Sequence, residues 1–84
     1  MELEFDPDKD RANVAKHGIS LSRAVELEHS VYVVDHRFMG ERRYRVYGTI
    51  DGQPYCLAAV IREDTVRAIS LRRAHVKEYA RHVS

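Results

Sequence analysis

The strongest constraint on the fold is a period-two alternation near the middle of the chain. Between Arg42 and Ile50, mostly apolar positions alternate with mostly charged or polar ones, which is typical of a β-strand. One predicted face carries Tyr44, Val46, Gly48 and Ile50, and the other carries Arg43, Arg45, Tyr47 and Thr49. Asp51-Gly52 follows directly and is a strong signal for a tight hairpin.

Three further segments are expected to join this strand. Tyr55–Ile61 is apolar on both faces, so we predict that it is the central strand. Glu63-Asp64 predicts a tight turn into a strand over Thr65–Leu71, and Val31–Val34 predicts a strand before the hairpin. His36–Glu41 is predicted as a loop. These strands form a small antiparallel sheet, and alternation at Leu3–Phe5 adds a short N-terminal strand.

Capping residues predict two helices in the first part of the chain. Asp6-Pro7 is a typical helix start, and Lys16-His17-Gly18 is a typical end, with a glycine suited to the left-handed position. Only a few small apolar residues, among them Val14, can form the inward face of this helix. Ser20 is predicted to start a second helix that places Glu28 on one face with Leu21 and ends near His29.

A third helix is expected at the C-terminal end. Arg72-Arg73 is predicted to open it after a cap at Ser70 or a near neighbour. The apolar spacing of the helix is given by Val76, Tyr79, Ala80 and Val83. The predicted fold class is α+β: an antiparallel sheet packed against two N-terminal helices and one C-terminal helix.

With 84 residues the chain forms a single domain, residues 1–84, whose core is small. No apolar run approaches the length of a membrane span, and the acidic start Met1–Glu4 is unlike a secretory signal. The lone cysteine, Cys56, has no partner for an internal disulfide. These features predict a cytoplasmic protein without a membrane partner.

Net charge is distributed unevenly along the sequence. Residues 1–36 have a net charge of −4 and residues 37–84 a net charge of +5. Such asymmetry favours a polyanion or an oppositely charged protein as a partner.

Residue spacing argues against several kinds of site. The five histidines show no helical metal-ligand spacing, so we predict no metal site. No glycine-rich loop follows a strand, so we predict no nucleotide cofactor. Cys56 lies in the most apolar strand and is interpreted as a small buried hydrophobe rather than a nucleophile.

Arginine placement is the remaining signal for chemistry. Guanidinium groups and one tyrosine are predicted along one side of the sheet, a composition that grips phosphates and stacks bases; the residues are Arg43, Arg45, Tyr47, Arg67, Arg72 and Arg73. The alternative is that these arginines face solvent and pair with the acidic half of the chain. A second candidate is His17 beside Lys16, because a helix C-terminus suits a proton-transferring histidine. Its own alternative is ordinary helix capping.

If these groups meet, the simplest chemistry is cleavage of RNA without a metal. The 2′-OH is its own nucleophile, so the protein need only move protons and stabilise charge on the phosphorus centre. Glu26 or Glu28 would orient His17 or act as a second acid or base.

Two blocks of the sequence resemble the BrnT-type toxin family. The first is Asp6-Pro7-x-Lys9, Asn13 and Lys16-His17-Gly18-Ile19-Ser20; the second is Arg42, Gly48, Arg67-x-Ile69-Ser70-x-Arg72-Arg73-Ala74 and Glu78. The resemblance covers nearly the whole chain. It departs at Leu21-Ser22-Arg23, where Phe and Glu are common, and at His82, where the family tends to have a tyrosine; here Tyr79 is nearer.

This resemblance implies a RelE-like fold and a ribonuclease toxin of a type II toxin–antitoxin pair. It implies a toxin that inhibits translation and needs no cofactor. It also implies a cognate antitoxin with a ribbon-helix-helix-type DNA-binding module, through which alone the toxin would contact operator DNA.

The expected catalytic set is His17, Lys16, Glu28, Arg67, Arg72 and Arg73, and the expected RNA-binding set is Arg43, Arg45, Tyr47 and Tyr79. The alternative function is a catalytically inactive, toxin-like module that uses the same basic face to bind an acidic protein or a nucleic acid.

Overall fold

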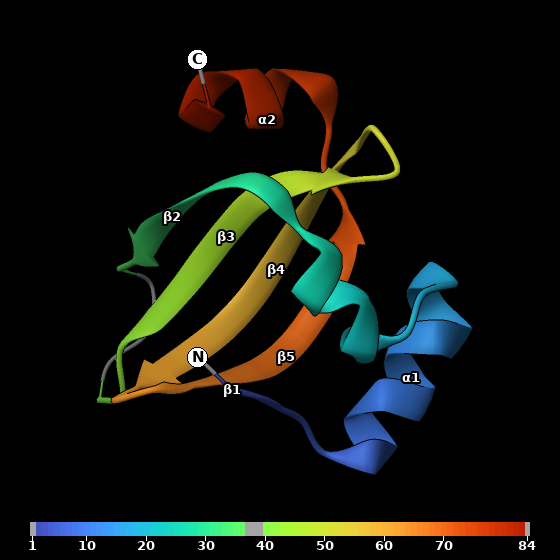
Figure 1. The fold of residues 1–84 in the computed structure, drawn as a ribbon, viewed down its shortest axis with the longest axis vertical. Coiled ribbons are helices and arrows are strands. Elements are labelled where there is room, and N and C mark those ends of the chain that lie inside the picture. Colours follow the sequence, from blue (N-terminus) through green and yellow to red (C-terminus); the bar gives the residue numbers. More distant parts are fainter. Residues whose placement is uncertain (1, 37–39, 84) are drawn as a thin grey trace.

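The computed structural model describes residues 2–36 and 40–83, so part of the predicted loop at His36–Glu41 lies outside the described residues. A five-stranded sheet and three helical segments make up the fold (Figure 1). In chain order the elements are β1 (Glu2–Glu4), α1 (Pro7–His17), η1 (Leu21–Glu26), β2 (Glu28–Asp35), β3 (Arg43–Ile50), β4 (Gln53–Arg62), β5 (Thr65–Arg73) and α2 (Val76–Val83).

The sheet has the strand order β1-β5-β4-β3-β2, so β4 is central as the sequence predicts. β2 to β5 form an antiparallel meander. The prediction of a wholly antiparallel sheet is wrong, because β1 pairs with β5 in parallel, from Glu2 opposite Thr65 to Glu4 opposite Arg67. The chain must cross by way of α1, η1 and the meander before it reaches β5, and it then runs in the same direction as β1.

The second predicted helix is shorter and tighter than expected. η1 is a single 3₁₀ segment that Ser20 caps, and Leu27 already has extended backbone angles. Glu28 is therefore the first residue of β2 and not a helical residue, which corrects its predicted position.

β2 lies unusually close to β3 where it begins. A Cβ at Gly48 would lie 2.9 Å from the Glu28 carbonyl oxygen, so only glycine allows this approach. His29 follows with a φ of 52°, inside an irregularity in the pairing between β2 and β3. The backbone contact at Gly48 thus favours a strand at Glu28 over a further helical turn.

Arg72 and Arg73 are also placed differently from the prediction. They are the last residues of β5, opposite Cys56 and Tyr55 of β4, and α2 begins only at Val76. Ser70 pairs with Ala58 in the middle of the ladder and does not cap a helix. Because these residues pair with β4, the segment is a strand and not the predicted start of a helix.

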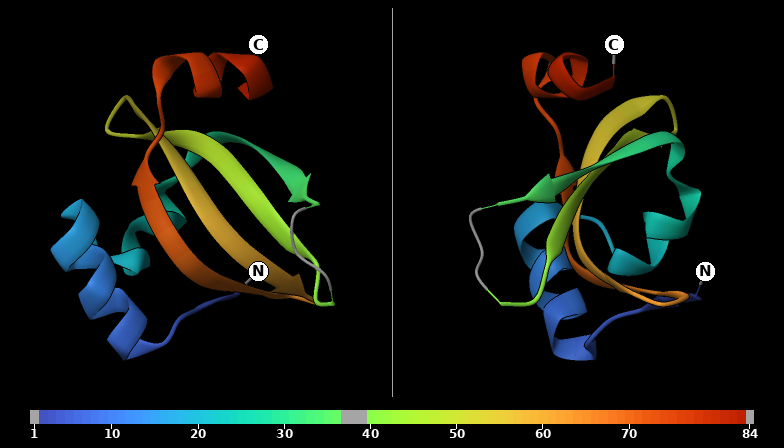
Figure 2. Two further views of the ribbon diagram at one scale, coloured as in Figure 1. Left: turned by 180° about the vertical axis from the view of Figure 1, so that it is seen from behind. Right: turned by 90° about the vertical axis from the view of Figure 1, so that its left-hand side faces the viewer.

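Two small cores lie on opposite faces of the sheet (Figure 2). On one face η1 contributes Leu21 and Ala24, which pack with Leu57 and Leu71. On the other face α2 covers one end of the sheet at Tyr47, Cys56 and Ala74. Cys56 is buried, as predicted.

α1 is attached to the sheet by a polar residue. Its apolar side chains Ala12, Val14 and Ala15 are exposed, contrary to the prediction of an apolar inward face, and its one buried residue is Asn13. The Asn13 amide donates to the Ile19 and Leu71 carbonyl oxygens, each at 2.9 Å, and accepts from the Leu71 amide at 3.0 Å. These bonds fix the C-terminal half of α1 beside the end of β5.

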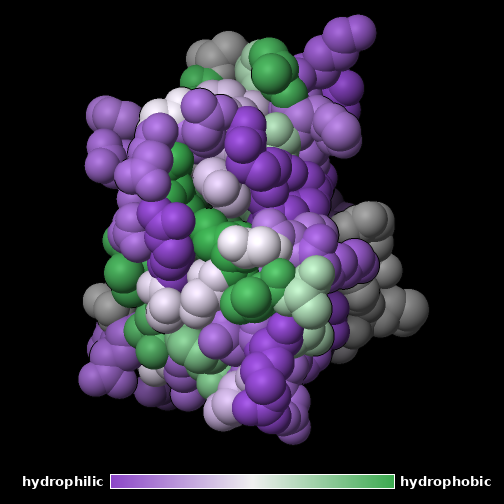
Figure 3. All heavy atoms as spheres, turned by 90° about the vertical axis from the view of Figure 1, so that its right-hand side faces the viewer, coloured by the Kyte–Doolittle hydropathy of each residue, from purple (hydrophilic) through white to green (hydrophobic). Residues whose placement is uncertain are grey.

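Hydrophilic residues dominate the surface seen from the side on which α1 lies, with hydrophobic residues in patches among them (Figure 3). Within the described ranges, no helix has the length and apolar character that crossing a membrane requires.

Candidate functional site: a cationic depression between two helices

An open depression of about 660 Å³ lies where the end of α1, the end of β5 and α2 come together. Four cationic side chains, two imidazoles and one carboxylate line it: Lys16, Arg72, Arg73, Arg81, His17, His75 and Glu78. Positive charge exceeds negative charge, so the depression is suited to an anionic ligand.

The last turn of α1 brings Lys16 and His17 to this depression. Gly18 ends the helix in the left-handed conformation, with a φ of 73°, and its amide donates to the Val14 carbonyl at 2.8 Å. Because Asn13 binds the backbone of Leu71, the turn that follows it lies beside Arg72. The sequence predicted this helix end correctly.

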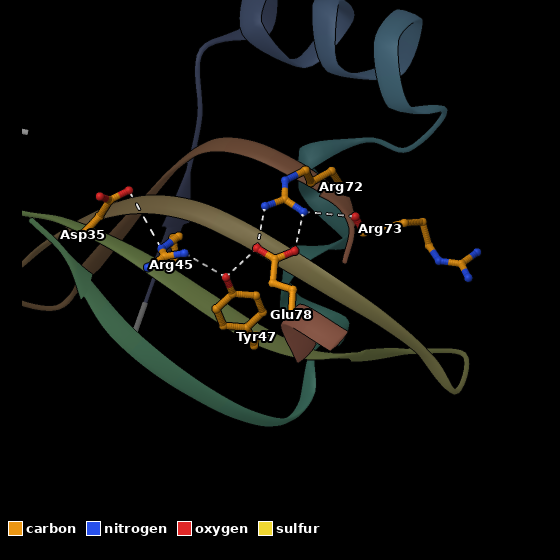
Figure 4. Close-up of polar contacts among 6 residues, drawn as sticks. All are labelled: Asp35, Arg45, Tyr47, Arg72, Arg73 and Glu78. Carbon is orange, nitrogen blue, oxygen red and sulfur yellow. Dashed lines mark hydrogen bonds and ion pairs between the residues drawn. The ribbon is translucent and has the colours of Figure 1, made fainter. Parts of the chain in front are cut away.

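Arg72 and Glu78 form a two-pronged ion pair on the floor of the site (Figure 4). The two terminal nitrogens of Arg72 donate to the two carboxylate oxygens of Glu78 at 3.0 and 2.9 Å. The Tyr47 hydroxyl donates to Glu78 Oε2 at 2.7 Å. Arg73 points away from this cluster, and its guanidinium donates to Gln53 Oε1 at 2.7 Å (Figure 4).

These contacts change the ionisation of three groups. The hydrogen bonds from Arg72, and secondarily the one from Tyr47, lower the pKa of Glu78 to about 2. Glu78 stands three residues after His75, whose backbone amide also lowers its pKa, as in the capping pattern at helix starts. Glu78 in turn raises the pKa of Arg72, and burial raises the pKa of Tyr47 above its ordinary value. Glu78 is thus a fixed anion that orients Arg72.

Tyr47 is fully buried, and its ring is stacked on His82 with centroids 4.7 Å apart. The predicted base-stacking role is therefore incompatible with its position in this structure. Its hydroxyl instead accepts from Arg45 at 3.1 Å and so links Arg45 to Glu78. Tyr79 packs against the same core from α2 and does not line the depression.

The structure separates two predicted catalytic residues from this site. Glu28 lies exposed at the start of β2. Arg67 lies in β5 beside β1, and its guanidinium pairs with Glu4 at 3.3 Å. Neither lines the depression that contains His17 and Arg72. Glu26, the alternative to Glu28, is paired with Arg23 on the surface of η1 at 2.9 Å.

Three residues of the depression were missing from the predicted set: His75, Glu78 and Arg81. His75 lies three residues after Arg72, and Glu78 belongs to the second block of the family resemblance. Once β5 is known to extend to Arg73, His75 falls on the turn into α2 and Glu78 falls in the first turn of α2. The wrong helix start concealed this turn from the sequence-based interpretation.

Across residues 2–36 and 40–83, no group of three or more His, Cys, Asp or Glu side chains is placed to hold a metal ion. The side chains that line the depression offer charge stabilisation by cations and proton transfer by imidazoles.

A family model and a solved structure both show similarity to this chain. A family model described as the ribonuclease toxin BrnT of type II toxin–antitoxin systems matches residues 5–78. Among solved structures, the crystal structure of the Brucella abortus ribonuclease toxin BrnT is similar in fold, with a TM-score of 0.72 and 19% sequence identity over 89% of this chain and 97% of that one. The comparison with curated protein sequences gave no match. Because the family model covers most of the chain, this protein belongs to the BrnT family of ribonuclease toxins of type II toxin–antitoxin systems.

Proposed function

We propose that the chain is an endoribonuclease toxin that cuts RNA by attack of the 2′-OH on the adjacent phosphate, without a metal ion. The observation that carries this proposal is the convergence of His17 and His75 with four cations in one depression, in a chain of the BrnT family. Two imidazoles are enough for the two proton transfers of this reaction.

Each group has a role that follows from its chemistry. One imidazole accepts the proton of the 2′-OH while the other donates a proton to the leaving 5′ oxygen. Glu78 holds one edge of the Arg72 guanidinium, and the remaining N–H groups of Arg72 donate hydrogen bonds to the phosphate oxygens. Lys16, Arg73 and Arg81 add positive charge where negative charge develops in the transition state.

A cleavage assay tests this proposal. The purified chain is incubated with total RNA in EDTA, and the variants His17→Ala and His75→Ala are compared with it at equal folded concentration. Each variant is expected to cut at least about 100-fold more slowly, which is the usual loss when an acid or base is removed. His36→Ala is the matched control, because His36 is exposed and outside the depression, and it should cut at the parent rate.

Two results would contradict the assignment. Parent-level cleavage by both folded histidine variants would remove the imidazoles from the mechanism, and loss of cleavage in EDTA would show that a metal is required. RNA that is bound but never cut would favour the inactive binding module.

We further propose that a cognate antitoxin neutralises the chain and that free toxin lowers translation. Type II systems pair a protein toxin with a protein antitoxin, which supports the first part. The antitoxin would contain the ribbon-helix-helix-type DNA-binding module and would make all operator contacts. Co-expression with the neighbouring reading frame should give a complex that no longer cuts RNA; two products that purify separately would contradict the pairing.

A further inference from the structure

A second, smaller depression lies on the sheet face that carries α2 at one end. It has a volume of about 190 Å³. Its charged lining is Arg43, Arg45, Arg72 and Asp35, and Ala58 and Ser70 contribute small side chains to it. The strand register explains the hollow, because Arg45, Ala58 and Ser70 lie side by side across β3, β4 and β5. Because the side chains of Ala58 and Ser70 are small, they leave space beside the long side chain of Arg45.

The two depressions are joined by one residue. Arg72 lines both of them, and the row Tyr47, Cys56 and Arg72 lies next to the row of Arg45 in the sheet. Figure 4 shows the connection as a chain of contacts from Asp35 through Arg45, Tyr47 and Glu78 to Arg72. Arg72 is therefore placed to contact a ligand in either depression.

Arg45 has hydrogen-bonding capacity that its neighbours do not fill. Its NH1 atom donates to the Tyr47 hydroxyl at 3.1 Å. Its Nε atom is buried and has no hydrogen-bond partner among the described residues; it lies 3.9 Å from Asp35 Oδ2, at ion-pair distance. The Arg45 side chain is 29% exposed, so its terminal nitrogens, rather than the shielded Nε, can donate to an anion that enters the hollow.

We propose that this smaller depression is a second phosphate subsite, which binds the phosphate next to the scissile one in a single-stranded RNA. The proposal rests on the function proposed above and extends it to a second nucleotide. Arg43 and Arg45 bind the second phosphate, while Arg72 lies between the two subsites.

The observations favour a phosphate over the carboxylates of an acidic peptide. A volume of about 190 Å³ has room for one compact anion, and the hollow shares Arg72 with a depression whose charge suits a scissile phosphate. Guanidinium forks match the tetrahedral oxygens of phosphate from more than one side. An antitoxin that fills the hollow with acidic side chains would be a different ligand, and the experiment below separates the two.

The experiment is a double-mutant cycle that combines one change in the protein with one change in a phosphate of the RNA probe. The probe is a labelled 2′-O-methyl uridine trinucleotide, which has two phosphates and no 2′-OH and so cannot be cut. In two further probes, one phosphate or the other is a neutral methylphosphonate. For the parent, neutralising the phosphate that occupies the second subsite should weaken binding about tenfold, as one charge-assisted contact predicts.

In the double variant Arg43→Gln/Arg45→Gln the same neutralisation should change the Kd by less than about twofold, because both partners of that phosphate are gone, and each single variant should lie between this value and the parent's. Ala58→Leu, which fills the hollow without removing an arginine, should give the same result as the double variant. Arg62→Gln is the control: Arg62 is exposed and paired with Glu41, so the tenfold difference should remain.

Equal sensitivity of all variants to the methylphosphonate would overturn the subsite. The subsite would also be overturned if Arg43→Gln weakened the binding of the antitoxin but left the affinity for the trinucleotide unchanged. The cleavage assay is read separately. If the parent binds the probes as expected but cuts no RNA, the subsite is supported and the catalytic function is refuted. If the parent cuts RNA but shows no tenfold difference between the probes, the catalytic function is supported and the subsite is refuted.

Discussion

At the scale of single residues, Glu78 connects the site to the stability of the fold. It accepts both terminal nitrogens of Arg72 and the Tyr47 hydroxyl. Its pKa of about 2 lies below the ordinary value of 4.5, so the folded state favours the ionised carboxylate. This contribution to stability is fully present above pH 4.5 and is lost as the pH falls toward 2.

Glu78→Gln should therefore destabilise the protein at neutral pH but much less in acid. We expect a loss of about 2 kcal/mol at pH 7, allowing for the partial exposure of the pair. The measurement is the free energy of unfolding of parent and variant from pH 7 to pH 2.5. A difference that stays constant over this range would show that Arg72 does not hold the carboxylate as described.

Individual site residues were predictable where a local signal placed them. His17 and Lys16 precede a helix-ending glycine, so their position at the end of α1 follows from a local rule. His75 and Glu78 depend on where β5 ends, and that end is set by pairing with β4, a contact distant in sequence. Tyr47 was predicted on the correct face, but the sequence did not show that α2 would cover it.

At the scale of secondary-structure elements, α1 is held by hydrogen bonds rather than by apolar packing. Asn13 is its single buried residue and makes three bonds to backbone atoms, two of them to Leu71. Asn13→Ala should lower the free energy of unfolding by about 2–4 kcal/mol, because buried backbone groups lose their partners. Cleavage should fall as well, since α1 carries His17 to the site.

Val14→Ala in the same helix is the control, because Val14 is 46% exposed. It should change stability by less than about 0.5 kcal/mol. Denaturant unfolding and cleavage are measured for both variants. An Asn13→Ala protein with the stability and activity of the parent would mean that other contacts position α1.

Elements with strong local signals were predicted well. The hairpin at Asp51-Gly52 and the caps at Asp6 and Gly18 are present. Non-local contacts decided the remainder: Gly48 admits the Glu28 backbone, and the pairing of β1 with β5 in parallel follows from the path of the whole chain. Neither contact produces a periodic pattern of residues from which it could be predicted.

At the scale of the whole molecule, the uneven charge of the sequence becomes a localised cationic site. Lys16 comes from the acidic half of the chain and joins arginines of the basic half. RNA binding should then depend steeply on salt. Two phosphate subsites predict a slope of about −1.4 for the logarithm of the association constant against the logarithm of salt concentration.

The slope is measured with an uncleavable 2′-O-methyl RNA of the length that the site can cover. Arg81→Gln should reduce its magnitude by about 0.7, the value for one phosphate contact. Arg11→Gln, outside the depression and paired with Asp8, should leave the slope unchanged. A slope near zero for the parent would mean that binding is not driven by phosphate neutralisation.

The depression is assembled from residues 16–17 and 72–81, which are separated by nearly the whole fold. A ribosome makes a polypeptide from its N-terminal end at about 5–20 residues per second. During most of that synthesis the growing chain contains the end of α1 but neither the end of β5 nor α2. On the function proposed above, a nascent chain therefore cannot cut its own messenger until the last segments have emerged and folded. By the same reasoning, a reading frame interrupted before codon 72 gives a product that lacks most of the depression.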